Sequence, residues 1–94
     1  MSDATHSDFE KNANLARTFL SDQLTDSEQL MMYGLYKQAT MGDCDRTGFS
    51  FSPKENMKRH AWAALRGMCS DDAKRRYCRQ TATFMARMKG EGSV

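Results

Sequence analysis

Two tyrosines and a lysine stand together near the middle of the chain, spaced as neighbours on one helix face. Tyr33 and Tyr36 are three residues apart, and Lys37 follows Tyr33 by four. Residues three and four apart meet on a helix surface, so a helix here gathers two phenol rings and one ammonium group. Aromatic rings offer flat apolar surfaces with a polar edge, and ammonium groups bind anions. The pattern suits a ligand that combines a planar ring with an anionic group.

The same spacing also has a purely structural interpretation. Tyrosines at the edge of a core bury their rings and expose their hydroxyls, and a neighbouring lysine lays its stem along apolar surface. Lys58, four residues before Trp62, stands at the border of another apolar stripe, where lysines usually only flank a core. Because binding pockets are few per protein, the pattern alone favours this second interpretation.

Length and composition indicate one folded domain over residues 1–94, with a core from about residue 7 to residue 89. The 94 residues are 39% hydrophobic and 28% charged, which is enough apolar content for a globule. No apolar run approaches the roughly 20 residues of a membrane span. The N-terminus lacks the pattern of a secretory signal, and the three cysteines form no Cys-x-x-Cys pair. We therefore expect a cytoplasmic protein with free thiols and neither a zinc site nor a disulfide framework.

Capping patterns predict four helices. Ser/Thr-x-x-Glu boxes at residues 7–10, 25–28 and 52–55 mark three helix starts, with Ser7, Thr25 and Ser52 as N-caps. Ser70 is the expected N-cap of the fourth helix, and Gly42, Gly67 and Gly90 are the expected helix ends. Strand signals are weak, because Ile is absent and no alternating Val/Ile/Thr run occurs.

Helical periodicity predicts which residues face the core. The expected stripes are Phe9, Ala13, Ala16 and Leu20; Met32, Leu35 and Ala39; Met57, Ala61, Ala64 and Leu65; and Ala73, Tyr77, Phe84 and Met88. In the second helix, Leu30, Tyr33, Tyr36 and Lys37 cover an adjoining face. This helix therefore has one face for the core and another that is free to meet a ligand.

The long connection after Gly42 resembles half of a calcium loop. Asp43, Asp45, Thr47 and Gly48 match its first, third, fifth and sixth positions. The twelfth position, normally a bidentate glutamate, is the cation Lys54. We therefore expect a polar surface loop and no metal site.

Two other classes of function are alternatives to ligand binding. Basic segments such as AKRRYCRQ at residues 73–80 suit a nucleic-acid or protein-interaction module. A net charge of only +2, with Asp71 and Asp72 interrupting the basic run, argues against nucleic acid. An enzyme is not indicated, because no Ser/His/Asp pattern or carboxylate pair occurs. His6 is expected in a frayed terminus and His60 on a polar face.

Three segments together resemble the acyl-CoA-binding protein family. They are YGLYKQATMGD at residues 33–43, KRHAWAALRG at 58–67 and SDDAKRRY at 70–77. The resemblance, from about Phe9 to about Met88, implies an all-α bundle of four helices that forms a shallow bowl. It also implies non-catalytic binding of medium- and long-chain fatty acyl-CoA by an intracellular carrier and pool former. A monomer is expected, with no cofactor, no nucleic-acid partner and at most transient membrane contact.

The resemblance also implies roles for individual residues. Tyr33, Lys37 and Lys58 are expected to hold the coenzyme A head group, above all its 3′-phosphate. Tyr36 is expected to meet the adenine, and Tyr77 to close the head-group site from the fourth helix. The residues expected at the acyl chain and the rim are Phe9, Ala13, Arg17, Leu30 and Met32. Arg17 stands where lysine is common, which keeps the charge but changes the shape. Arg59 stands where many members carry tryptophan, and a charge in place of an apolar wall predicts that affinity stops rising early with chain length.

Overall fold

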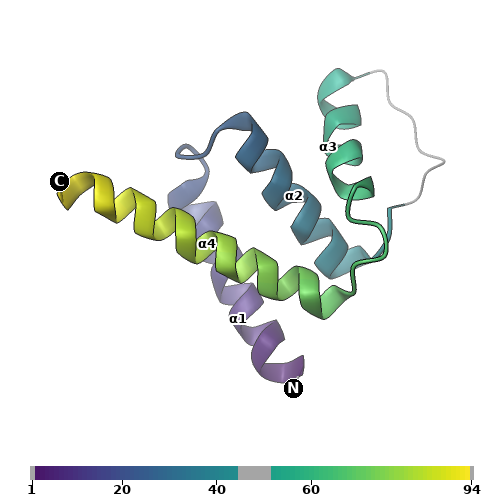
Figure 1. The fold of residues 1–94 in the computed structure, drawn as a ribbon, viewed down its shortest axis with the longest axis horizontal. Helices are drawn as coiled ribbons and strands as arrows, with labels where there is room; N and C mark the ends of the chain where they lie inside the picture. Colours follow the sequence, from purple (N-terminus) through teal and green to yellow (C-terminus); the bar gives the residue numbers. More distant parts are fainter. Residues whose placement is uncertain (1, 45–51, 94) are drawn as a thin grey trace.

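Four α-helices and one π-helical turn make up the described part of the chain. The structure, a computed structural model, describes residues 2–44 and 52–93. The elements in chain order are α1 (Ser2–Leu15), η1 (Ala16–Leu20), α2 (Asp26–Met41), α3 (Pro53–Ala63) and α4 (Ser70–Ser93) (Figure 1). No strand occurs within these ranges, so the all-α prediction is confirmed. None of the described helices is long and apolar enough to cross a membrane.

The longest helix, α4, supports two others. It packs against both α1 and α2, whereas α3 contacts α2 alone among the described helices (Figure 1). The α1 and α2 backbones stay apart from each other, although both rest on α4. The molecule is accordingly flat, with extents of 46 × 35 × 18 Å. This arrangement leaves one space between α1 and α2 and another beside α3.

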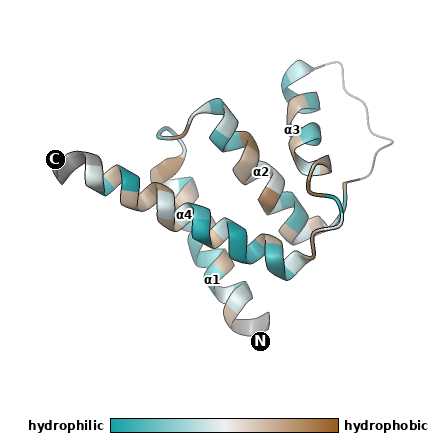
Figure 2. Ribbon diagram, in the orientation of Figure 1, coloured by the Kyte–Doolittle hydropathy of each residue, from teal (hydrophilic) through white to brown (hydrophobic). Residues whose placement is uncertain are grey.

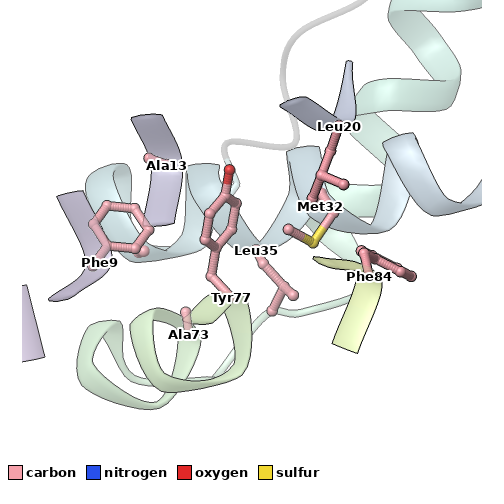
Figure 3. Packing of buried hydrophobic residues seen from close by; sticks show 9 residues of the cluster. Phe9, Ala13, Leu20, Met32, Leu35, Ala73, Tyr77 and Phe84 are labelled. Atoms are coloured by element: carbon pink, nitrogen blue, oxygen red, sulfur yellow. The ribbon is translucent and has the colours of Figure 1, made fainter. Parts of the chain in front are cut away.

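The core lies where α1, η1 and α2 meet α4. Its buried apolar side chains are Phe9, Ala13, Leu20, Met32, Leu35, Ala39, Ala73, Tyr77 and Phe84 (Figure 3). These residues confirm the stripes predicted for the first, second and fourth helices. The face of α4 seen in Figure 2 is largely hydrophilic, as expected for the outer side of a helix with one buried stripe.

Two of the predicted caps form as expected. In α2, the Thr25 hydroxyl accepts from the Glu28 N–H at 3.1 Å, and the Glu28 carboxylate accepts from the Thr25 N–H at 2.9 Å. In α3, the Ser52 hydroxyl accepts from the Glu55 N–H at 3.4 Å, with Pro53 at the first helical position. Gly42 ends α2 at φ 79°, in the left-handed region that favours glycine.

The prediction that the first helix begins at Ser7 is wrong. The helix begins at Ser2, so Ser7 lies more than one turn inside it. Glu10 does not return to the Ser7 backbone but pairs with His6 at 3.2 Å, an i,i+4 contact that a continuous helix makes. The Ser-x-x-Glu spacing thus fits a helix interior as well as a cap. His6 is consequently part of α1 and not of a frayed end.

The ends of the third and fourth helices also differ from prediction. After Ala63 the chain tightens into three-residue turns, with N–H groups of Leu65 and Arg66 bonded to the carbonyls three positions back, and Gly67 at φ 92° closes them. Ser70 is the first residue of α4 and not the cap before it, and its hydroxyl donates to the Ala39 carbonyl at 2.6 Å. Gly90 does not end α4, which continues through it to Ser93.

The core stripe predicted for the third helix is only partly correct. No residue of α3 is buried, and Met57 and Ala64 are exposed; only Leu65, just beyond the helix, packs against the core. The reason is that α3 contacts a single helix, so part of its apolar stripe has no partner helix among the described residues. An apolar face without a partner helix is available to a ligand.

Candidate functional site

Tyr33 is the centre of a group of cations and rings contributed by two helices. The Lys58 Nζ lies 4.9 Å and the Lys37 Nζ 5.9 Å from the centre of the Tyr33 ring. Lys37 also lies over Trp62 of α3, at 5.5 Å. Each distance is within the range of a cation–π contact. Two ammonium groups thus converge on one ring, and the chemistry of this arrangement suits a doubly charged anion such as a phosphate.

A glycine brings the two helices close enough for this group to form. A Cβ built on Gly34 would lie 2.7 Å from the carbonyl oxygen of Ala61, nearer than real Cβ contacts come. Any larger residue would therefore force α2 and α3 apart. Gly34 is thus required for the approach of the two helices, and with it for the approach of Lys58 to Tyr33.

Three further rings connect α1, α2 and α4. Phe9 stacks on Tyr36 with centroids 5.6 Å apart, and meets Tyr77 edge-on at 5.2 Å. Phe9 and Tyr77 are buried, whereas Tyr36 is 37% exposed and so keeps ring surface free. Figure 3 shows Tyr77 rising from α4 with its hydroxyl directed away from that helix. Burial raises the pKa of the Tyr77 hydroxyl, which therefore stays protonated and able to donate.

The first of two hollows, the α1–α2 hollow, lies between α1, η1 and α2. Its volume is about 310 Å³. Its lining residues are Ala13, Ala16, Arg17, Leu20, Ser21, Leu24, Gln29, Met32, Tyr33, Tyr36 and Tyr77. All three tyrosines of the chain therefore face one space, together with the guanidinium of Arg17. A flat heteroaromatic group fits such a lining.

The second, the α2–α3 hollow, lies between α2 and α3. Its volume is about 570 Å³, and it is lined by Asp26, Gln29, Leu30, Tyr33, Lys54, Met57 and Lys58. Leu30 from α2 and Met57 from α3 provide its aliphatic surface. Gln29 and Tyr33 line both hollows. A ligand that occupies both hollows would therefore pass Tyr33 and Gln29.

Arg17 reaches the α1–α2 hollow from the π-helical turn. Its Nη2 donates to the Asn14 Oδ1 at 3.0 Å. Single π-turns often occur at functional sites, because they shift the side chains that follow. The sequence contained no signal for this turn, which follows directly on α1 without a break.

A hydrogen-bonded network that the sequence did not predict fixes the end of α2. Gln38 is fully buried, and its Nε2 donates to the Asp43 Oδ1 and to the Met68 carbonyl, each at 2.8 Å. The same Asp43 oxygen accepts from the Gly67 N–H at 2.9 Å. The Gly67 and Gln38 hydrogen bonds lower the pKa of Asp43. Asp43 is thus a structural acceptor, and the other matched calcium-loop positions, Asp45, Thr47 and Gly48, lie outside the described residues.

Trp62 belongs to the same junction. Its Nε1 donates to the Gly42 carbonyl at 2.7 Å, while its ring lies under Lys37. The Lys-Gln pair in the tyrosine segment therefore has two separate tasks. Lys37 faces the rings, and Gln38 holds the helix end in place. Only Lys37 was singled out from the sequence, because the partners of Gln38 cannot be seen there.

The structure brings most of the predicted site residues together. Tyr33, Lys37 and Lys58 form the central group, and Ala13, Arg17, Met32, Tyr36 and Tyr77 line the α1–α2 hollow. Leu30 lines only the α2–α3 hollow. Phe9 lines neither and is 3% exposed. Lys54, Met57 and Gln29 line the hollows but were not predicted as site residues. The apolar stripe of the third helix includes Met57, but the periodicity predicts that this stripe belongs to the core.

The four helices and the two adjoining hollows define a helical ligand-binding bundle, and comparisons with known proteins identify its family. The family described as "Acyl CoA binding protein" matches residues 6–81. The chain is 40% identical to an acyl-CoA-binding protein of Fritillaria agrestis over 72 residues, covering 74% of this chain and 80% of that one. It is 36% identical to acyl-CoA-binding protein 2 of Saccharomyces pastorianus over 80 residues, covering 84% and 91%.

A solved structure agrees with these relatives. The crystal structure of Oryza sativa acyl-CoA-binding protein 2 superposes with a TM-score of 0.83 at 31% identity, covering 92% of this chain and 96% of that one. The chain therefore belongs to the acyl-CoA-binding protein family. The fold and the family expected from the sequence are confirmed.

Proposed function

We propose that this protein binds fatty acyl-CoA thioesters and serves as their carrier and pool, without catalysing a reaction. The observation that carries the proposal is the position of Tyr33, which lines both hollows and has two ammonium groups over its ring. One hollow is rich in aromatic rings and the other contains exposed aliphatic side chains. A nucleotide joined to a fatty acyl chain would place its base at the aromatic hollow and its acyl chain at the aliphatic one.

For the head group, we propose the α1–α2 hollow and the cations beside it. The adenine would lie against Tyr33, Tyr36 and Tyr77, and the 3′-phosphate would meet Lys37 and Lys58. Base–aromatic stacking contributes about 1–3 kcal/mol per base, and bonds to charged groups about 1.5–3 kcal/mol. Ala13, Arg17 and Met32 would form the rim of this part of the site. The burial of Phe9 supports a role in holding Tyr36 and Tyr77.

For the acyl chain, we propose the α2–α3 hollow. Leu30 and Met57 offer aliphatic surface there, and no other helix of the described residues covers the apolar side of α3. Burying one methylene contributes about 0.8 kcal/mol, so affinity should rise with chain length until the hollow is filled. Medium and long chains are accordingly the proposed ligands.

The proposal includes a monomer in the cytoplasm, with no nucleic-acid partner and at most transient membrane contact. The three cysteines are free, in keeping with a reducing compartment. Burial raises the pKa of the Cys78 thiol, which makes it a poor nucleophile. In the basic segment of α4, Arg75 pairs with Asp72, which reduces the positive charge available to nucleic acid.

Native mass spectrometry with a mixed pool of acyl-CoA esters tests the proposal. One ester should bind per protein, with long chains selected from the pool. Retention on immobilised coenzyme A and on heparin at moderate salt should be compared in parallel. Binding to heparin or DNA without capture of any ester would overturn the proposal in favour of a nucleic-acid module.

A further inference from the structure

Met57 is the exposed apolar residue among those that line the α2–α3 hollow. Its side chain lines the hollow, opposite Leu30, and the residue is 54% exposed. A thioether in such a position can be reached by small oxidants when the hollow is empty. Methionine sulfur is readily oxidised to the sulfoxide, which turns an apolar side chain into a polar one.

Other methionines provide natural comparisons for Met57. Met32 is 6% exposed and belongs to the core, so we expect oxidants to react with it much more slowly than with Met57. Met41 is 66% exposed at the end of α2 and lines neither hollow. Met57 is thus as open as a surface methionine, yet it lies where the acyl chain is proposed to bind.

We propose that Met57 is a modification site at which oxidation by a hydroperoxide weakens acyl-chain binding, an inference that rests on the proposed function. A lone pair of the sulfur attacks the terminal peroxide oxygen, an S–O bond forms and the O–O bond breaks. The sulfur loses two electrons and the peroxide gains them. The departing oxygen takes the proton from the transferred hydroxyl and leaves as an alcohol, or as water when hydrogen peroxide is the oxidant.

The sulfoxide weakens binding of the acyl chain and leaves binding of the head group unchanged. It places a strong hydrogen-bond acceptor on the aliphatic wall, beside the ammonium groups of Lys54 and Lys58 that line the same hollow. The chain then loses its contact with α3, while Tyr36 and Tyr77 lie in the other hollow. We expect hexadecanoyl-CoA to bind about 5- to 30-fold more weakly and CoA itself to bind unchanged, because a half-exposed methionine gains part of its full burial energy from the chain.

Peroxide footprinting tests whether the acyl chain lies against Met57. The protein is treated with dilute hydrogen peroxide alone, with CoA, or with hexadecanoyl-CoA, and sulfoxide at Met57 and Met41 is measured by peptide mass spectrometry. Hexadecanoyl-CoA should slow oxidation of Met57 relative to Met41, and CoA should not. An unchanged ratio, with the ester bound by calorimetry, would overturn the inference and leave the proposed function standing. If calorimetry detects no binding of the ester, both fail together.

Two substitutions test the effect of the sulfoxide. Met57→Gln, which resembles the sulfoxide in length and polarity, should weaken hexadecanoyl-CoA binding by the factor given above, and the matched exposed variant Met41→Gln should not. Met57→Leu should lose no further affinity on peroxide treatment, whereas the parent protein should. Equal affinity of Met57→Gln and the parent protein, both folded by circular dichroism, would overturn the inference.

Discussion

Gly34 of α2 lies against the backbone of Ala61 in α3 so closely that an added Cβ would be 2.7 Å from the Ala61 carbonyl oxygen. This contact sets the distance between the helices that carry Lys37 and Lys58. It joins the fold to the proposed site, because α3 has no contact with another described helix that could position it.

Gly34→Ala should push α3 away from α2. Overpacking at a backbone contact costs about 1–3 kcal/mol, measurable by urea denaturation, and binding of hexadecanoyl-CoA should weaken because Lys58 and Met57 move with α3. Gly90→Ala is the matched control, since a Cβ added there would meet no atom outside the backbone of its own helix within 4 Å. The control should gain about 0.5–1 kcal/mol in stability, as alanine does over glycine in a helix. A fully stable Gly34→Ala variant would show that the helix contact is not tight.

Acid should weaken the link between the start of α2 and α4. The Glu28 carboxylate accepts hydrogen bonds from the Arg87 Nη1 at 2.7 Å and Nη2 at 3.0 Å. This contact lowers the pKa of Glu28 to about 2. Because the pKa of Glu28 is lower in the folded state than in the unfolded state, the ionised carboxylate stabilises the fold at pH values above the unfolded-state pKa of about 4.3. This contribution is lost as the pH falls toward 2. Urea midpoints of the parent and Glu28→Gln should converge over that range. Parallel pH profiles would contradict the assignment.

The buried amide of Gln38 should be needed for stability more than for ligand contact. Gln38→Leu leaves the Met68 carbonyl without this donor, which should cost about 1–3 kcal/mol. The exposed Gln23→Leu should change stability by less than about 0.5 kcal/mol. Thermal denaturation of both variants checks this, and equal melting temperatures would mean that the Gln38 bonds contribute little.

The sequence predicted the helices and the faces of α2 because periodicity and capping are local. Met32 and Leu35 are buried, whereas Tyr33 and Lys37 are partly exposed on the adjoining face, as expected. It could not predict that Gln38 bonds to Met68, thirty residues away, or that α3 packs on one side only. For that reason Met57 was assigned to the core, although it is exposed. The Ser-x-x-Glu pattern at Ser7 led to a wrong helix start, because the same pattern also occurs inside helices.

Lys37→Met should weaken binding through the 3′-phosphate alone. The substitution keeps most of the side-chain stem and removes the charge, so hexadecanoyl-CoA should bind about 10- to 150-fold more weakly. With the dephospho-CoA ester, calorimetry should give nearly equal affinities for parent and variant. An equal loss against both ligands would mean that Lys37 does not contact the 3′-phosphate, and the site would have to be assigned to Lys58.

The central claim is that one ligand occupies both hollows and is recognised at both ends. Isothermal titration calorimetry with hexadecanoyl-CoA, CoA and hexadecanoate measures this directly. The ester should bind far more tightly than either part alone, with one site per protein. Equal affinity of the ester and the free fatty acid would show that the cations at Tyr33 do not hold a head group and would contradict the claim.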